Sequence, residues 1–146
     1  MIVENYSLRI RNADITKIKS HAENTYPEEC CGVLIGKRED DMFSVDEVRE
    51  MRNINENKNT RFNIDPFDLI KLEDKLDEQG RLMIGIYHSH PNHPAKPSDT
   101  DLKFAWPNLC YIITSIIDGK MDKITSWSLI DTDTQKNFIE VPMEVE

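Results

Sequence analysis

The sequence predicts an α/β fold, built as one layered domain. Apolar segments of strand length alternate along the chain with segments of helical periodicity, and this interleaving favours an α/β domain over a helical bundle or a β-sandwich. A length of 146 residues agrees with one domain over 1–146, because domains usually span about 100–200 residues. No internal repeat and no linker-like segment divides the chain.

The N-terminal half is expected to contain one helix among three strands. Ile15, Ile18 and Ala22 recur at helical spacing, which predicts a helix over residues 13–24. Short apolar or alternating segments predict the strands, at residues 7–11, 31–36 and 43–51. The segment that follows, 53–61, is polar and rich in Asn, so we expect an exposed loop there.

The C-terminal half is expected to contain two helices and four strands. Asp65 and Pro66 form a strong N-cap and first-turn pair, so a helix should begin there and end near Gly80. Ser98 is the expected cap of a shorter helix over 98–104. Apolar and β-rich segments predict the strands, at residues 82–87, 109–117, 123–130 and 138–141, the last as an edge strand.

Charge and hydropathy exclude two classes of partner. The chain has 18 Lys and Arg against 27 Asp and Glu, a formal charge of −9. Binding to nucleic acid is disfavoured, since contacts to phosphates need a basic face. The longest apolar runs are far shorter than the roughly 20 residues of a membrane helix, so no membrane association is expected.

Several apolar side chains are expected to be buried. Cys30, Cys31 and Cys110 are odd in number and two are adjacent, which makes a disulfide framework improbable and predicts buried thiols in a reducing compartment. The N-terminus has no pattern of a secretory signal, so we expect a cytoplasmic protein. Trp106 and Trp127 are expected to be core aromatic residues.

One short stretch carries most of the chemical information. His88 and His90 stand at the end of the predicted strand over 82–87, and residues two apart on a strand point the same way. Asp101 lies on the first turn of the helix that follows Ser98. Two imidazoles and one carboxylate leave a fourth tetrahedral position open, as in catalytic zinc sites, so these three residues predict a zinc site.

A zinc site that activates water also needs a base. Glu28 and Glu29 directly precede the apolar segment 31–36, so either carboxylate reaches the site if that strand neighbours the one that ends at His88. Taken singly, each of these residues has a plainer interpretation. A lone His is usually an ordinary polar residue, Ser98 and Asp101 form a helix cap, and a loop glutamate is solvated.

Together these residues resemble the motif of the JAMM (MPN+) zinc metalloproteases. The matching pattern is Glu29 followed by His88-Ser89-His90-Pro91-x6-Ser98-x2-Asp101. The segments around 26–36, 61–66, 85–87, 94–102 and 105–107 are similar to the small prokaryotic, Mec-like branch of that family. The resemblance covers about residues 13–131.

The resemblance implies a curved mixed β-sheet flanked by helices on both sides, as in the cytidine-deaminase-like fold. It implies that His88, His90 and Asp101 bind Zn²⁺, that Glu29 is the general base with Glu28 as the second choice, and that Ser98 stabilises the reacting carbonyl oxygen. Members hydrolyse a peptide or isopeptide bond after the Gly-Gly tail of a ubiquitin-like or sulfur-carrier protein. Such a protein is the expected partner.

Three alternatives stay open at this point. A RadC-like protein linked to DNA repair shares the motif skeleton, although Ser89 and Asn92-His93 depart from its usual residues. A non-catalytic MPN scaffold would only bind partners, and a cytidine-deaminase-like zinc hydrolase would need a Pro-Cys-x-x-Cys pair that this sequence lacks. The sequence also leaves open whether the bond that is cut joins the Gly-Gly tail to one extra C-terminal residue or to a lysine side chain. The oligomeric state is open as well.

Overall fold

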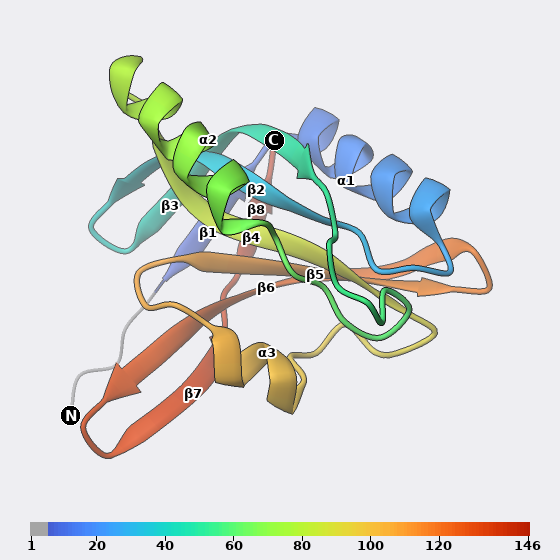
Figure 1. The fold of residues 1–146 in the computed structure, drawn as a ribbon. Helices are drawn as coiled ribbons and strands as arrows, with labels where there is room; N and C mark the ends of the chain where they lie inside the picture. Colours follow the sequence, from blue (N-terminus) through green and yellow to red (C-terminus); the bar gives the residue numbers. More distant parts are fainter. Residues whose placement is uncertain (1–5) are drawn as a thin grey trace.

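The computed structural model describes residues 6–146, and its framework is one eight-stranded curled sheet (Figure 1). The strand order is β7-β6-β5-β4-β2-β3-β1-β8. The strands are β1 (Ser7–Ile10), β2 (Cys31–Glu39), β3 (Met42–Met51), β4 (Leu82–Pro91), β5 (Cys110–Ile117), β6 (Lys120–Thr132), β7 (Gln135–Glu140) and β8 (Met143–Val145). Since β4 and β5 are parallel and β2 and β4 are antiparallel, the sheet is mixed and the predicted fold class is confirmed.

The central strand β2 is buried on both faces of the sheet because a helix packs against each face. Leu34 packs in the cluster that contains Ile18 of α1 (Asn12–Thr25). Its neighbours Val33 and Ile35 point to the other face, where they pack against Leu72 and Leu76 of α2 (Pro66–Glu78). The third helix, α3 (Asp99–Phe104), lies beside β7 (Figure 1). A strand buried on both faces reads as a continuous apolar run, as residues 31–36 do.

The register of the central strands decides where the end of β4 lies. In the antiparallel pair of β2 and β4, Cys31 stands opposite His88, so the start of β2 meets the end of β4. On the other edge of β4, Gly85 pairs with Cys110 of the parallel strand β5. A Cβ atom at Gly85 would lie 2.1 Å from the carbonyl oxygen of Cys110, so only glycine allows this approach.

Most predicted elements agree with the structure, and the corrections are local. The helix at Asp65 begins as predicted, since its carboxylate accepts a hydrogen bond from the amide of Phe67 at 2.9 Å. The strand β8 was not predicted because only three residues form it, by pairing with β1. Both C-terminal strands are also longer or shifted relative to 123–130 and 138–141.

The prediction of a core position for Trp106 is wrong. The Trp106 residue is 67% exposed, in the irregular segment between α3 and β5, and its backbone amide donates to the hydroxyl of Tyr111 at 2.7 Å. Trp127 is partly buried on β6. All three cysteines are free and buried, as predicted, and burial raises the pKa of Cys30 to about 12. None of the helices in residues 6–146 has the length and apolar character to cross a bilayer.

Candidate metal centre

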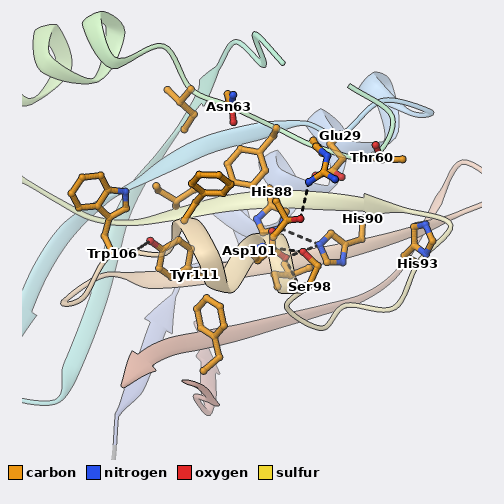
Figure 2. A pocket seen from close by; sticks show the side chains of 18 of the residues that line it. Glu29, Thr60, Asn63, His88, His90, His93, Ser98, Asp101, Trp106 and Tyr111 are labelled. Atoms are coloured by element: carbon orange, nitrogen blue, oxygen red, sulfur yellow. Dashed lines mark hydrogen bonds and ion pairs between the residues drawn. The ribbon is translucent and has the colours of Figure 1, made fainter. Parts of the chain in front are cut away.

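Two histidines at the end of β4 point to the same side of the sheet. His88 and His90 are both buried, and their Nε2 atoms lie 3.1 Å apart. Asp101, on the first turn of α3, brings one carboxylate oxygen to each ring: Oδ1 is 3.2 Å from Nε2 of His88, and Oδ2 is 3.1 Å from Nε2 of His90. Figure 2 shows the three side chains converging.

A reciprocal cap holds Asp101 in place at the start of α3. The amide of Asp101 donates to Oγ of Ser98 at 3.0 Å, and the amide of Ser98 donates to Oδ2 of Asp101 at 2.9 Å. The short helix therefore begins with both residues fixed relative to each other. The capping role expected for Ser98 from the sequence is present, and its hydroxyl proton stays available because Oγ acts here as an acceptor.

The hydrogen bond of His90 fixes which ring nitrogen faces Asp101. The carbonyl of Pro94 lies 2.8 Å from Nδ1 of His90 and can only accept, so Nδ1 carries the proton and Nε2 carries the lone pair when the ring is neutral. The ring of His88 is stacked on Phe62 at a centroid distance of 4.4 Å, and its Nδ1 has no partner among residues 6–146. Phe62 therefore shields this imidazole from water.

The electrostatics of the three side chains favour a bound cation. Burial lowers the pKa of His88, which keeps this ring neutral. Burial also acts to lower the pKa of His90, but the carboxylate of Asp101, the carbonyl of Pro94 and the charge of Glu29 together outweigh it, and the pKa is raised. For Asp101, burial alone would raise the pKa, yet its close contacts with both imidazoles hold the pKa well below its ordinary value.

The donor set fits a zinc ion. One ligand atom from each of His88, His90 and Asp101 can be chosen so that all lie within 4.8 Å of one another. With its Nδ1 proton donated to Pro94, a neutral His90 directs a lone pair at the carboxylate. Lone pairs that converge in this way repel one another unless a cation binds between them. Two imidazoles with one carboxylate are ligands that zinc accepts.

Glu29 lies beside these residues, whereas Glu28 does not. Glu29 is 5% exposed and lines one cavity together with His88 and His90. It lies there because the register of β2 and β4 brings the start of β2 next to His88. Burial raises the pKa of Glu29 to about 7, although the charges of His90 and Arg61 act to lower it. Glu28 is exposed and does not line the cavity. The position of the two glutamates before residues 31–36 left both alternatives open, and only the family resemblance favoured Glu29.

The backbone around Glu29 is anchored to two neighbouring segments. Its amide donates to the carbonyl of Lys58 at 2.7 Å, and its carbonyl accepts from the side chain of Asn53 at 3.0 Å. One residue further on, the amide of Cys30 donates to Oγ of Ser89 at 2.8 Å. Ser89 therefore points away from the two histidine rings and ties β2 to β4.

A cavity of about 770 Å³ opens over these residues, and its two ends differ in character. Trp106 and Tyr111 lie on one side of His88, while Glu29 and His93 lie on the other (Figure 2). His93 is exposed and stands at the rim of the cavity. The apolar side chains of the lining include Ile54, Ile64, Ile86, Phe104, Trp106 and Phe138.

Sequence reasoning missed several residues of this cavity. Arg61 lines it and donates from Nη1 to Oγ1 of Thr100 at 2.7 Å, which links the Asn-rich loop to α3. The loop itself is held by side chains of its own asparagines: Asn53 Oδ1 accepts from the amides of Asn55 and Asn63. Alternating Asn residues at 53, 55 and 57 were a signal of such turns.

The amino-acid sequence matches a known protein family over most of its length. The family described as "Prokaryotic homologs of the JAB domain" matches residues 12–130. A desampylase from Haloferax volcanii is 30% identical over 112 residues, 76% of this chain and 78% of that protein. A CysO-cysteine peptidase from Mycobacterium tuberculosis is 29% identical over 143 residues, 92% of this chain and 93% of that protein.

The fold also resembles a solved structure. A solution structure of a Desulfitobacterium hafniense protein superposes with a TM-score of 0.79 at 26% identity, and covers 95% of this chain and 92% of that one. The similarity therefore extends over the whole sheet and not only over the histidine strand. The two curated relatives are a desampylase and a peptidase by name, and this chain carries the arrangement of two histidines and one aspartate described above.

Proposed function

Because the chain belongs to the family of prokaryotic JAB-domain proteins, we propose that it is a zinc-dependent peptidase. Its proposed substrate is a ubiquitin-like or sulfur-carrier protein, cut after a C-terminal Gly-Gly. The observation that carries this proposal is the convergence of His88, His90 and Asp101 beside a buried glutamate on the wall of one cavity. The names of the relatives, a desampylase and a CysO-cysteine peptidase, support this class of substrate.

His88, His90 and Asp101 would hold the zinc ion. When bound, zinc supplies a Lewis acid that polarises a carbonyl group and lowers the pKa of water to about 7. Three protein ligands leave one position open for this chemistry. The cap between Ser98 and Asp101 and the hydrogen bond from His90 to Pro94 orient the ligand atoms before the ion binds.

Glu29 is the proposed general base and acid. A carboxylate with a pKa of about 7 accepts a proton from the attacking water and returns it to the leaving amine at neutral pH. No residue in 6–146 donates a hydrogen bond to its carboxylate, so both oxygens are available for these transfers. Burial, which raises this pKa, also keeps bulk water from competing for the proton.

Ser98 is the proposed donor to the carbonyl oxygen. Its Oγ accepts from the amide of Asp101, so its O–H points elsewhere and can donate where negative charge develops. Capping and catalysis therefore use different parts of one hydroxyl group. The acidic chain, with a net charge of −9, favours a protein substrate over a nucleic acid, and the buried free thiols suit an enzyme of the cytoplasm.

A cleavage assay tests the proposal directly. The zinc-loaded protein is incubated with small Gly-Gly-tailed proteins of its host, each extended by one residue or joined to a lysine, and the products are read by intact mass. We expect release after the second glycine, and a zinc chelator should abolish it. A zinc-loaded protein that cuts none of these substrates would contradict the proposal.

A further inference from the structure

Arg61 presents a guanidinium without a carboxylate partner to the cavity. Its Nη1 donates to Thr100, and in residues 6–146 no acidic side chain lies within 4.0 Å of its nitrogens. Five other arginines do form such ion pairs, namely Arg9, Arg11, Arg49, Arg52 and Arg81. Arg38 also has no ion pair in residues 6–146, but it donates to Asn108 and does not line the cavity. Arg61 is exposed at the cavity wall, so its free N–H donors are open to an anion that comes from outside the chain.

The position of Arg61 assigns it to one side of the reacting bond. Its charge acts on Glu29, and Asn53 donates to the backbone carbonyls of both residues at 3.0 Å. The group that protonates the leaving amine must lie next to that amine. Arg61, beside Glu29, therefore faces the leaving group, whereas the apolar end with Trp106 lies on the other side of His88 (Figure 2).

Resting on the proposed function, we propose that Arg61 binds the α-carboxylate of a single amino acid that follows the scissile glycine. Hydrolysis then consumes one water, breaks the C–N bond after the glycine, and releases one free amino acid and a carrier that ends in a glycine carboxylate. In such a substrate the α-carboxylate is two bonds from the scissile nitrogen. In a lysine isopeptide that nitrogen is followed by four methylene groups, and no carboxylate is near.

The remaining donors of Arg61 suit this role. A guanidinium has five N–H donors in a planar fork that matches a carboxylate, and only one of them is used on Thr100. Hydrogen bonds between two charged groups are about twice as strong as neutral ones. Arg61 thereby makes the enzyme a trimming peptidase that prefers a free carboxyl terminus one residue after Gly-Gly.

The test compares three forms of one Gly-Gly-tailed carrier protein. The first ends in one extra alanine with a free carboxylate, the second in alanine carboxamide, and the third is joined to the ε-amine of a lysine. We expect the wild-type kcat/KM for the carboxylate form to exceed that for the carboxamide by about 10- to 100-fold. The isopeptide should resemble the carboxamide.

Variants separate the proposed contact from general effects. Arg61→Ala should reduce the ratio of kcat/KM between the carboxylate and carboxamide forms to about 1, because only the carboxylate form uses the contact with the guanidinium. Lys96→Ala is the matched control, because Lys96 also lines the cavity and has no ion pair in residues 6–146. It should preserve the ratio. Thr100→Val removes the anchor of Arg61 and should reduce the ratio only in part.

A binding measurement gives a readout that does not depend on turnover. Zinc-loaded Glu29→Gln protein should bind the alanine-carboxylate form more tightly than the carboxamide, and adding Arg61→Ala should remove that difference. Cleavage with no preference in the wild type, or a preference that survives Arg61→Ala, overturns the inference and leaves the peptidase proposal standing. If no form is cleaved, both fall.

Discussion

Ser98 and Asp101 hold each other through two hydrogen bonds of 2.9 and 3.0 Å, each from the backbone amide of one residue to the side chain of the other, and Asp101 Oδ2 also lies 3.1 Å from Nε2 of His90. The start of α3 is thus one unit with the histidine strand. A helix of six residues has little stability of its own, so this cap fixes a carboxylate that packing alone would not fix.

Replacing the carboxylate should remove the metal. Asp101→Asn keeps the size of the side chain but takes away the negative charge that faces both imidazoles. Loss of a partner outside the ligand set typically lowers metal affinity about 10- to 100-fold, so loss of a ligand should lower it further. Zinc per chain, measured after dialysis, should fall from about one towards zero. Asp99→Asn, the control on the same helix, should retain zinc, and equal zinc in both variants would refute the site.

Ser98 should affect stability and turnover separately. Ser98→Ala removes the cap acceptor, which typically costs about 1 kcal/mol, and removes the proposed donor to the reacting oxygen, which typically costs about 10²–10³ in kcat. Ser98→Thr retains a hydroxyl and should restore both. Urea unfolding and steady-state kinetics measure the two effects. A Ser98→Ala variant with reduced stability and unchanged kcat would assign Ser98 to capping alone.

The sequence predicted the arrangement of the candidate site residues better than that of their surroundings. The reason is that the paired site residues lie close together in the sequence. His88 and His90 are two apart on one strand, and Ser98 and Asp101 share one helical turn, so local geometry sufficed to predict which way they point. The choice between Glu28 and Glu29 needed the register of β2 against β4, which pairs residues more than 50 positions apart.

The wrong prediction of a buried position for Trp106 also arose because its surroundings depend on segments far apart in the sequence. Large aromatic residues are usually buried, but α3 ends at Phe104, two residues before Trp106, and the Trp106 side chain lines a cavity and does not enter a core. Arg61 and Phe62 belong to the segment 61–66, for which the sequence showed only a family resemblance and no position in the fold. Their contacts with Thr100 and His88 depend on how a loop folds back over the sheet, which no local periodicity records.

The stability of the zinc-free protein should fall as pH rises through the titration of Glu29. Its pKa is about 7 in the folded chain against an ordinary value of 4.5, so below pH 4.5 the carboxyl is protonated in both states and costs nothing. Between these values only the unfolded chain ionises it, and above pH 7 the full cost, up to about 3 kcal/mol, is present. Urea unfolding at pH 5 and pH 8 measures this change.

A pair of variants isolates the contribution of Glu29 from that of other groups. Glu29→Gln cannot ionise, so its advantage in stability over the wild type should grow between pH 5 and pH 8. Glu28→Gln should run parallel to the wild type because Glu28 is exposed. Parallel curves for all three proteins would mean that Glu29 ionises in the fold as easily as in water.

The contact between β4 and β5 should tolerate no side chain at Gly85. A Cβ atom there would meet the Cys110 carbonyl oxygen at 2.1 Å and a methyl carbon of Leu34 at 2.9 Å, and the oxygen cannot move without separating the two strands. Overpacking of this kind typically costs about 1–3 kcal/mol, so Gly85→Ala should lower Tm by roughly 2–12 °C. Gly80→Asn is the control, because Gly80 has φ +66° with open space around it, and Asn tolerates this conformation. Differential scanning calorimetry should give a Tm near wild type for Gly80→Asn, and a Gly85→Ala protein just as stable would show that β4 and β5 can move apart freely.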